Sequence, residues 1–582
     1  PDNQSYEMYR LSNFFIYMIH SRLSIVDLNQ RSNQPYEYEN HSIIFNGEIY
    51  NYLELKNELE LKNYKFETSS DTEVLIKYIH CFGIEKTMNS LDGMFAFICL
   101  DTSLSKIFIA RDRFGEKPLY YYENSGEIFF ASETRILQNL VSDKLQIDLN
   151  SIYRFIKFGY RAINNNNSTF FKKVKSFRPS HFSCLNLENL DQKFIKYWSI
   201  NTNQDYKNLN FNDAKTLLKN ILVDTFESRF NADVPVAYFQ SGGVDSNLIS
   251  TIAKHELDYN TEGFYMSNSD SRYSEDTIVE ESSKKNSNNV NKFNIDHEES
   301  FIETLLNQIN YHNAPVYTTV DYCMFKLCEN IKQKGFKVVL TGTGADEIFS
   351  GYYDHFILNF IDLKHNDYKK FDTEFLDWKK NVLPKIRNPA FQSIENYKNS
   401  NLNYIFQNNE LSEDLFIKNF DFTFKECEFE FSNLRNRMAN ELLIETIPQT
   451  LNQDDLNCMH HSIENRSPYL SHKLVEFGYS IQQNHLANNG YLKNILREVG
   501  KDYADIQAFK NKTKVGFNYP TEKIINTESN QFKELMVRES EIYEFIDKEK
   551  FLNKLYSSKS LNNDESKTLF SIISSKLFMD SI

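Results

Sequence analysis

The sequence predicts a chain of two parts: an α+β part built on antiparallel sheet, then an α/β part with a helical C-terminal extension. Short β-rich runs separated by turn residues fill residues 14–190, which is typical of layered antiparallel sheet with helices. Beyond residue 212 strand-like runs alternate with helical segments, which indicates a parallel sheet covered by helices. From about residue 355 onward the pattern is mostly helical.

The front part contains the run SIIFNGEIYNYLELKNELE, which predicts a strand, a turn at Asn46-Gly47 and a helix with leucines placed for burial. MFAFICL (Met94–Leu100) predicts a buried strand. KIFIARD, PLYYYE and EIFFASE follow at close spacing with turn residues between them. We therefore expect layered antiparallel sheet here.

Residues 200–212 are polar, Asn-rich and without strong periodicity, so they predict the linker between the two parts. We place the first domain at residues 1–200 and the second at residues 210–582. In the second domain VPVAYF, TEGFYM and FKVVLTG predict strands, whereas KLVEFGYSI and YLKNILREVG predict helices.

Composition limits the partners of the protein. A net charge of −15 argues against nucleic acid, because phosphate neutralisation needs clustered basic side chains. Seven scattered cysteines without a CxxC pair disfavour a zinc ribbon or a disulfide framework and favour a cytoplasmic location. No apolar run approaches a membrane span. The first residues, PDNQSYEMYR, lack signal-peptide features and an initiator Met, so we expect the chain to begin inside a longer protein.

The stretch VAYFQSGGVDSNLIS (Val236–Ser250) predicts a strand, a glycine turn and a helix start. Such a turn binds phosphate, because glycines permit close backbone approach and the N–H groups of a helix start favour an anion. Its S-G-G-x-D-S pattern lacks the Gly-Lys-Ser/Thr of a P-loop and resembles the pyrophosphate-binding loop of ATP pyrophosphatases. A plain tight turn is the alternative for this motif alone. The candidate ATP-binding residues here are Ser241, Gly242, Gly243, Asp245 and Ser246.

A second segment, VVLTGTGADEIFSGYYDH (Val338–His355), again predicts a strand, a glycine-rich turn and a helix start. Ligands of open α/β sheets lie at the carboxyl ends of the strands, so both loops can face one nucleotide. Thr341 and Gly342 join the candidate ATP-binding residues. Asp245 and Asp346 are the candidate Mg²⁺ ligands, because hard cations prefer carboxylate oxygen.

These loops, with SIENRSPYLSHKLVEF, YLKNILREVG and NKTKVGF, closely resemble the synthetase domain of glutamine-dependent asparagine synthetases. The front part resembles their glutaminase domain, with SRLSIVD, FNGEIYNY, SDTEV, LDGMFAF, ARDRFGEKPLYYY and FASE in the family's order. The resemblance spans nearly the whole chain. It implies an N-terminal nucleophile-type αββα glutaminase domain followed by an α/β ATP pyrophosphatase (PP-loop) synthetase domain.

The resemblance further implies that the front domain hydrolyses glutamine through an N-terminal cysteine whose α-amino group acts as base. Arg22 would bind the glutamine carboxylate, and Glu48 with Asp71 its α-amino group. Asn46 and the Gly47 N–H would form the oxyanion hole. For Arg22 alone, a surface ion pair is the simpler reading.

The nucleophile itself has no match in the sequence. The family reads RGPD near the place where this chain opens with Pro1-Asp2, so we expect the cysteine to lie upstream and the chain as given not to hydrolyse glutamine. Cys81 and Cys99 stand in apolar runs, where an inert buried thiol is the better reading.

For the second domain, the resemblance implies that ammonia arrives through a tunnel and attacks a carboxylate that ATP has adenylated, releasing AMP and pyrophosphate. A carboxylate is a poor electrophile until its oxygen becomes a good leaving group, and water must be excluded. Lys493, Arg497 and Lys514 match basic positions of the family, although a solvated helix face would also suit each of them. The predicted catalytic residues are Asn46, Gly47, Asp346, Lys493 and Lys514.

Two departures from the family pattern concern the acceptor. Thr343 stands where the family has an acidic residue thought to help deprotonate ammonia, and a neutral hydroxyl cannot serve as such a base. Asn465 and Ser467 stand at positions that are commonly apolar. Aspartate is the first choice of acceptor; the alternative is a uronic acid sugar, converted to its uronamide in surface polysaccharide biosynthesis.

Two further readings compete with glutamine-dependent amidation. A β-lactam-forming synthetase has the same architecture without ammonia, but the retained glutamine-site residues count against it. An idle scaffold of the same fold is disfavoured by the intact loop at residues 241–246 and by Asp346. We therefore predict a cytoplasmic ligase that requires ATP and Mg²⁺, acts on small-molecule substrates and forms a homodimer, as its family implies.

Overall fold

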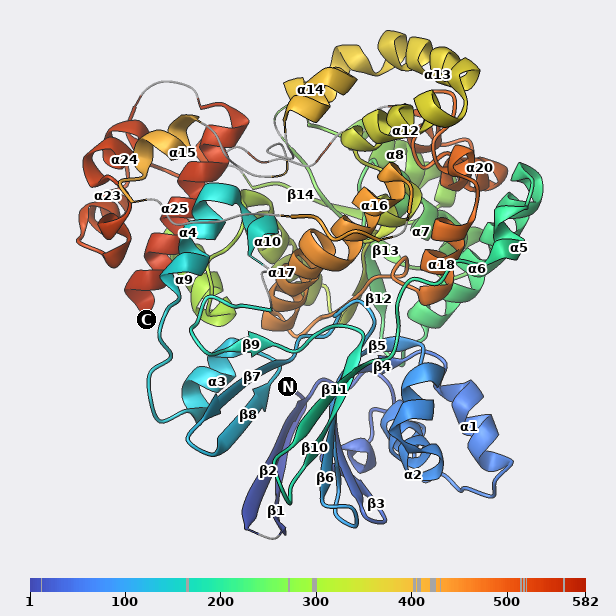
Figure 1. Ribbon diagram of the computed structural model, residues 1–582, viewed down its shortest axis with the longest axis vertical. Coiled ribbons are helices and arrows are strands. Elements are labelled where there is room, and N and C mark those ends of the chain that lie inside the picture. Colours follow the sequence, from blue (N-terminus) through green and yellow to red (C-terminus); the bar gives the residue numbers. More distant parts are fainter. Residues whose placement is uncertain are drawn as a thin grey trace.

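The computed structural model describes the chain from Pro1 to Ile582 (Figure 1). It leaves out residues 12, 164–166, 269, 271–272, 296–300, 401–404, 406–409, 419–424, 430, 513–515, 517–518, 520 and 558–560. The antiparallel sheets lie at one end of the molecule and the parallel sheet with its helices at the other (Figure 1). The predicted α+β and α/β architecture is confirmed.

The front part is built on a six-stranded antiparallel sheet. In spatial order its strands are β11 (Gln192–Lys196), β10 (His181–Asn186), β6 (Lys106–Arg111), β5 (Gly93–Asp101), β4 (His41–Ile49) and β3 (Tyr36–Tyr38). Helices α1 (Tyr52–Glu60) and α2 (Asp71–Ser90) cover one face, where Phe45, Phe95 and Phe97 are buried against the helix residue Val74. Alternation of side chains along each strand supplies the apolar face that the helices need.

The opposite face of this sheet carries a second, smaller β layer. It consists of the hairpin β1 (Asn3–Leu11) and β2 (Phe14–Arg22), and of β7 (Tyr120–Asn124), β8 (Glu127–Ala131) and β9 (Lys175–Ser176). Leu100, Ile107 and Ile109 form a core with residues of these strands, and α3 (Thr134–Leu140) packs on β8. The order helix, sheet, sheet, helix agrees with the predicted αββα arrangement.

The turn predicted at Asn46-Gly47 is wrong. Both residues lie inside β4, which continues to Ile49 and pairs Gly47 with Phe95 of β5. Gly47 has a φ of +139°, and a Cβ built on it would lie 2.0 Å from the Met94 carbonyl oxygen. The glycine therefore serves a close strand approach and not a chain reversal.

The second part contains a five-stranded parallel sheet in the order β14-β13-β12-β15-β16. These strands are β12 (Val236–Phe239), β13 (Glu262–Met266), β14 (Val290–Phe293), β15 (Val338–Leu340) and β16 (Glu464–Arg466). Three of them match the predicted strands. The edge strand β16 was not predicted, because its three residues are polar although they are buried.

Helices cover both faces of the parallel sheet, as a parallel sheet requires. One core holds Val236 and Val338 with the helices α6 (Phe211–Phe230), α7 (Val244–His255), α18 (His472–Ser480) and α20 (Asn494–Tyr503). The other holds Phe264 and Val339 with α9 (Phe301–His312), α10 (Thr319–Gln333) and α25 (Asn563–Ser581). The two predicted helical segments are confirmed as α18 and α20.

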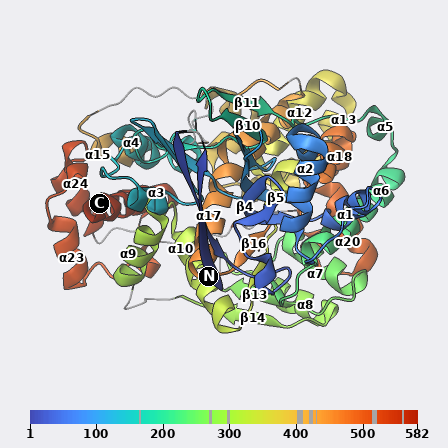
Figure 2. The ribbon, with the colours of Figure 1, turned by 90° about the horizontal axis from the view of Figure 1, so that it is seen from below.

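The remaining helices connect and extend this core. They are α4 (Leu149–Phe158), α5 (Gln204–Lys207), α8 (Asp276–Asn286), α11 (Ala345–Phe349), α12 (Tyr353–Asn366), α13 (Tyr368–Asn381), α14 (Ile394–Asn399), α15 (Glu410–Leu415), α16 (Asn433–Asn440), α17 (Ile447–His460), α19 (Gln483–Leu486), α21 (Gln507–Lys510), α22 (Thr521–Ile524), α23 (Asn530–Val537) and α24 (Lys548–Leu555). Seen from below, α23 and α24 lie at one side of the molecule, and α5 and α6 lie at the other side (Figure 2). Across the part of the chain that the structure describes, no helix combines the length and apolar character that crossing a membrane needs.

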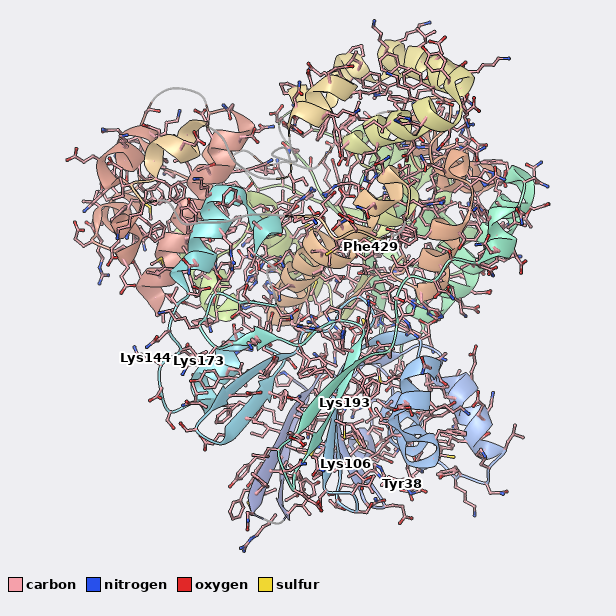
Figure 3. The ribbon with its side chains drawn as sticks, viewed as in Figure 1. Tyr38, Lys106, Lys144, Lys173, Lys193 and Phe429 are labelled. Atoms are coloured by element: carbon pink, nitrogen blue, oxygen red, sulfur yellow. The ribbon has the colours of Figure 1, made fainter. Side chains whose placement is uncertain are left out.

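Side chains fill the space between the sheets of the front part and the helices above them (Figure 3). The helix α4 belongs to the first 200 residues, yet it packs against α25 near the C-terminus. Tyr153 and Phe155 of α4 share one core with Phe578 of α25. The two parts are thus joined by a continuous apolar core as well as by the chain itself.

Candidate active sites

Residues 241–243 form the loop between the carboxyl end of β12 and the start of α7, and the first turn of α7 carries Asp245 and Ser246. The Ser241 Oγ accepts from the Gly243 N–H at 3.1 Å, and the Ser241 N–H donates to the Ser246 Oγ at 3.0 Å. The Asn247 side chain donates to the carbonyls of Ser241 and Gly243. Side chains therefore fix the shape of the loop at the helix start, where backbone N–H groups favour an anion.

The loop after β15 lies directly beside this first loop. A Cβ built on Gly342 would stand 2.9 Å from the Cβ of Asp245, so only glycine permits the close approach. Beyond it, α11 begins at Ala345 and carries Asp346 in its first turn. The predicted convergence of Asp245 and Asp346 is present, since both contact the same ammonium group.

Lys493 joins the two loops. Its Nζ lies 2.6 Å from Asp245 Oδ2 and 2.7 Å from Asp346 Oδ1, and the side chain is buried. Burial alone would lower the pKa of Lys493, but Asp245 and Asp346 outweigh it and hold this pKa above its usual value. The lysine therefore stays charged between the two carboxylates.

The other two basic residues predicted for this site are Arg497 and Lys514, and Arg497 does not share the position of Lys493 between the two carboxylates. Arg497 is buried and donates to the carbonyls of Leu492 and Ala508. Its contacts fix the start of α20 and therefore the turn that presents Lys493. Lys514 lies outside the described residues.

The predicted glutamine-site residues of the front part gather near the end of β4. Asp71 stands at the start of α2, and its Oδ2 accepts from the Ile49 N–H at 2.9 Å. Glu48 is buried on the same strand, and Asn46 and Gly47 are half-buried just before it. Glu48 and Asp71 act electrostatically on each other.

Arg22 lies at the end of β2 and is buried. Its guanidinium donates to the Asn29 carbonyl at 2.8 Å, to the Val26 carbonyl at 3.2 Å and also to the Asp27 carbonyl. These contacts organise the loop at residues 23–33. Asp71 and Glu48 act on its charge from nearby, so it belongs to the same cluster.

Burial raises the pKa of Glu48 well above its usual value, and it raises the pKa of Asp71 to about 6. Repulsion between the two carboxylates adds to the shift of Glu48. A cationic group placed between Glu48 and Asp71 would lower both pKa values, because it favours the ionised carboxylates. The α-ammonium of an amino acid has this charge.

We expect Asp71→Asn to weaken glutamine binding by about 10- to 100-fold, the loss of one charge-assisted hydrogen bond. In the wild type, binding should strengthen as the pH rises through about 6, because Asp71 ionises there and its carboxylate form attracts the ligand. Titration calorimetry at pH 5 and pH 8 checks both effects. Exposed Glu58→Gln on α1 is the control, and an unchanged Kd in Asp71→Asn would contradict the assignment.

Sequence analysis missed the residues that join the two parts. Arg466 of β16 is fully buried, with Nε 2.8 Å from Glu464 Oε1 and Nη2 3.6 Å from Glu48 Oε1. Its Nη1 donates to the carbonyls of Arg229 and Asn231. Arg466 thus links Glu48 of the front part to the parallel sheet. A buried charge of this kind carries no hydrophobic periodicity that would reveal it.

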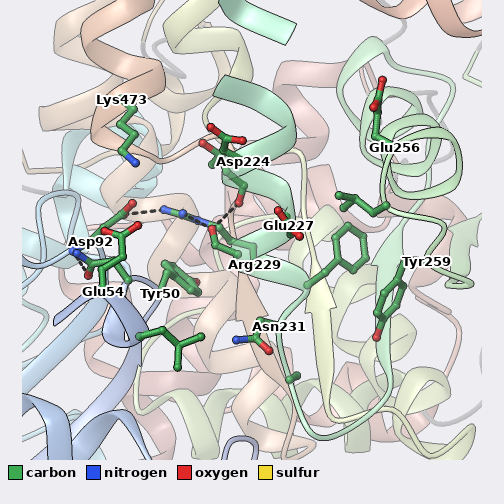
Figure 4. A pocket seen from close by; sticks show the side chains of 17 residues that line it. Tyr50, Glu54, Asp92, Asp224, Glu227, Arg229, Asn231, Glu256, Tyr259 and Lys473 are labelled. Atoms are coloured by element: carbon green, nitrogen blue, oxygen red, sulfur yellow. Dashed lines mark hydrogen bonds and ion pairs between the residues drawn. The ribbon is translucent and has the colours of Figure 1, made fainter. Parts of the chain in front are cut away.

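Two cavities lie along the junction. One of about 870 Å³ lies between α1 and α6 and is lined by Tyr50, Arg229 and Lys473, where Arg229 Nη2 bonds Asp92 Oδ1 at 2.9 Å (Figure 4). A smaller one of about 80 Å³ lies between Tyr120 of the front part and Asn452 of α17. Its volume is enough for a few molecules of the size of water.

The residues that depart from the family pattern meet at the second loop. Thr341 Oγ1 donates to Thr343 Oγ1 at 3.0 Å and lies 3.4 Å from Ser467 Oγ. Thr343 Oγ1 in turn donates to Asp454 Oδ2 of α17 at 3.4 Å. The hydroxyl–carboxylate chain, defined as Ser467–Thr341–Thr343–Asp454, therefore runs from β16 to α17.

A separate cluster of metal-ligating side chains comprises Asp354, His355 and Glu441. Arg437 lies 3.2 Å from Glu441 Oε1 and 3.6 Å from Asp354 Oδ2. The guanidinium already supplies the positive charge that these carboxylates need. We therefore interpret this cluster as a buried ion-pair network and not as a metal centre.

An αββα part joined to an α/β part with paired phosphate-type loops defines a class II glutamine amidotransferase coupled to a synthetase. The family model of the glutamine amidotransferase domain matches residues 1–198, and that of asparagine synthase matches residues 217–580. The chain belongs to the asparagine synthase family and is an enzyme of this ligase type.

The curated relatives of this chain include asparagine synthetases. Asparagine synthetase 1 (glutamine-hydrolyzing) of Bacillus subtilis is 26% identical over 95% of this chain and 87% of its own length. A putative asparagine synthetase of Methanocaldococcus jannaschii is 28% identical over 61% of this chain and 70% of its own. A solved glutamine phosphoribosylpyrophosphate amidotransferase of B. subtilis is 15% identical over 57% of this chain and 63% of that chain, with a TM-score of 0.22.

Proposed function

We propose that the protein amidates a carboxylate by activating it with ATP as an acyl adenylate, which ammonia from glutamine then attacks. Aspartate is the acceptor, and asparagine, AMP and pyrophosphate are the products. The observation that carries this proposal is the contact of Lys493 with Asp245 and Asp346. Three separate segments converge there, at the carboxyl ends of neighbouring parallel strands, where α/β sheets bind nucleotides.

The loop residues fit a polyphosphate. The Gly242 N–H donates to the Glu275 carboxylate at 2.9 Å, so this backbone group already binds an anionic oxygen. The helix α7 starts at Val244 with its N–H groups beside it. These features support Ser241, Gly242, Gly243 and Ser246 as ATP-binding residues, with Thr341 and Gly342 closing the opposite side.

The two carboxylates fit Mg²⁺, because they already hold a cationic group between them. Mg²⁺ held by Asp245 and Asp346 would neutralise phosphate charge. Lys493 would turn its ammonium towards the pyrophosphate, where it stabilises charge that develops on the leaving group. Its buried position keeps this charge away from water and so strengthens the interaction.

In this proposal the front part binds glutamine, and ammonia is released from it by a nucleophilic cysteine that has no match in this sequence. Arg22, Glu48 and Asp71 bind glutamine, and Asn46 with the Gly47 N–H stabilises the oxyanion. In this proposal, ammonia crosses the junction at the small cavity between Tyr120 and Asn452 on its way to the synthetase site. A homodimer, a cytoplasmic location and domain limits at residues 1–200 and 210–582 remain predictions from the sequence.

A uronic acid sugar is the second candidate acceptor, and the hydroxyl–carboxylate chain favours it. Ser467 and Thr343 present hydroxyl groups beside the nucleotide loops, and Asn465 is buried on β16, two residues before Ser467 in the chain. Hydroxyl-rich sugars pair well with such groups. Aspartate stays first, because asparagine synthetases are the relatives of this chain.

The test is pyrophosphate release from ATP and Mg²⁺ with ammonium supplied directly, which makes the assay independent of glutamine. We expect release that depends on aspartate, with asparagine formed in equal amount. Release that depends on a uronic acid sugar and not on aspartate would transfer the assignment to the second acceptor. Failure of ATP to bind at all would contradict an amidating ligase.

A further inference from the structure

We propose that Asp454 is the proton acceptor for the attacking ammonia, and that it replaces the acidic side chain which Thr343 lacks. This inference rests on the proposed function and names a group for its second step. The geometric basis is the contact between Thr343 Oγ1 and Asp454 Oδ2 at 3.4 Å. Asp454 belongs to α17, far from the nucleotide loops in sequence.

The orientation of the hydroxyl groups suits a proton relay. Thr343 Oγ1 accepts from Thr341 Oγ1 and donates to Asp454 Oδ2. A proton that arrives on Thr343 Oγ1 can therefore be exchanged for the one it gives to Asp454. Asp454 itself is only partly buried, so its carboxylate has room to change its protonation.

The small cavity at the junction lies beside the same helix. Asn452 and Leu456 of α17 line the small cavity at the junction, and they stand two residues on either side of Asp454. The opposite wall is formed by Tyr120 of the front part, whose hydroxyl accepts from the Asn452 amide at 2.7 Å. The helix α17 therefore lines the cavity and also carries Asp454, the proposed base.

The charges around Asp454 suit a base that works near neutral pH. Burial raises the pKa of Asp454 to about 7, and Asp321 of α10 with Asp455 of α17 adds to the shift. Asp455 is itself paired with Lys117 at 3.2 Å. A base with a pKa close to the working pH combines availability with proton affinity.

In the attack of ammonia on the acyl adenylate, each bond that forms is matched by a bond that breaks. The lone pair of ammonia forms the C–N bond to the acyl carbon, and the C–O bond to the phosphate of AMP breaks with its electron pair leaving on AMP. One N–H proton passes to Thr343 Oγ1, whose own proton moves to Asp454 Oδ2. The products are the amide, AMP and a neutral Asp454, which later returns its proton to solvent.

The experiment separates the two steps of the reaction in the whole protein. Carboxylate-dependent exchange of pyrophosphate into ATP reports adenylate formation, and amide formation from ammonium reports attack. We expect Asp454→Asn and Thr343→Val to lower amide formation about 100-fold more than exchange, the usual contribution of general base catalysis. Exposed Asp258→Asn, whose side chain is 95% exposed, is the matched control.

The pH profile and a rescue distinguish proton transfer from a structural role. Plotted per concentration of unprotonated ammonia, the wild-type rate should rise as the pH increases through about 7, since the Asp454 carboxylate is the active form. This rise should be absent in Asp454→Asn. The double variant Asp454→Asn with Thr343→Glu should regain most of the lost rate, because it returns a carboxylate to the loop.

Folding is checked by thermal unfolding at pH 8. Asp454→Asn should unfold no earlier than the wild type, because it removes a charge that burial disfavours. Amide formation by Asp454→Asn within about fivefold of wild type, or no rescue by Thr343→Glu, would overturn the role of Asp454. If the wild type shows no carboxylate-dependent exchange, both this inference and the proposed function are overturned.

Discussion

Replacing Lys493 by alanine is expected to lower pyrophosphate exchange by at least about 100-fold, the scale observed when one preorganised charge-stabilising group is removed. The variant loses the ammonium that lies 2.6 and 2.7 Å from Asp245 and Asp346. Two ionised carboxylates then face each other at the position where a negatively charged polyphosphate should bind. Both ATP binding and the stabilisation of the leaving group suffer.

Exchange assays at a temperature where the variant stays folded provide the measurement. Lys501→Ala is the matched control, because Lys501 lies on α20, the helix that begins directly after Lys493, and pairs with the partly exposed Glu498. We expect that control to keep its exchange rate. A Lys493→Ala enzyme with nearly normal exchange would place the nucleotide elsewhere.

Replacing Arg466 by methionine is expected to cost about 3–5 kcal/mol of unfolding free energy, the usual result of leaving buried charges unpaired. Glu464 and Glu48 would lose their cationic partner, and the carbonyls of Arg229 and Asn231 would lose a donor. The effect is large because Arg466 has no solvent exposure. Water cannot replace the missing contacts.

Urea unfolding measures this loss. Adding Glu464→Gln to Arg466→Met should recover part of the stability, since it removes one of the uncompensated carboxylates. Arg31→Met is the control, because the Arg31 side chain is 52% exposed, and a surface change of this kind stays within about 0.5 kcal/mol. A loss below 1 kcal/mol in Arg466→Met would refute the central role of this residue.

The regular parts of the fold were predictable from local pattern. The strands β12, β13 and β15 have continuous apolar runs, and the loops after β12 and β15 contain glycines at the positions that need them. These features depend on neighbouring residues in the chain, so a single sequence reveals them. The resemblance to a family added the candidate residues, including Lys493.

The remaining features depend on contacts between distant segments. Asn46-Gly47 has the composition of a turn, but its glycine is required by the backbone of β5. The strand β16 consists of Glu, Asn and Arg, whose burial is possible only because Arg466 pairs with Glu464. Asp454 has no local signal at all. Its meaning arises from the hydroxyl of Thr343, which lies on another loop.

The position of β16 also determines when the parallel sheet can be completed while the ribosome synthesises the chain. Its neighbour β15 ends at Leu340, and residues 341–463 must follow before β16 can pair with it. Until then Glu48 lacks its contact with Arg466, although the front part has long been translated. Because the N-terminal portion of a chain folds first, we expect the ribosome-bound front part to carry an unneutralised acidic surface that closes only when Arg466 emerges.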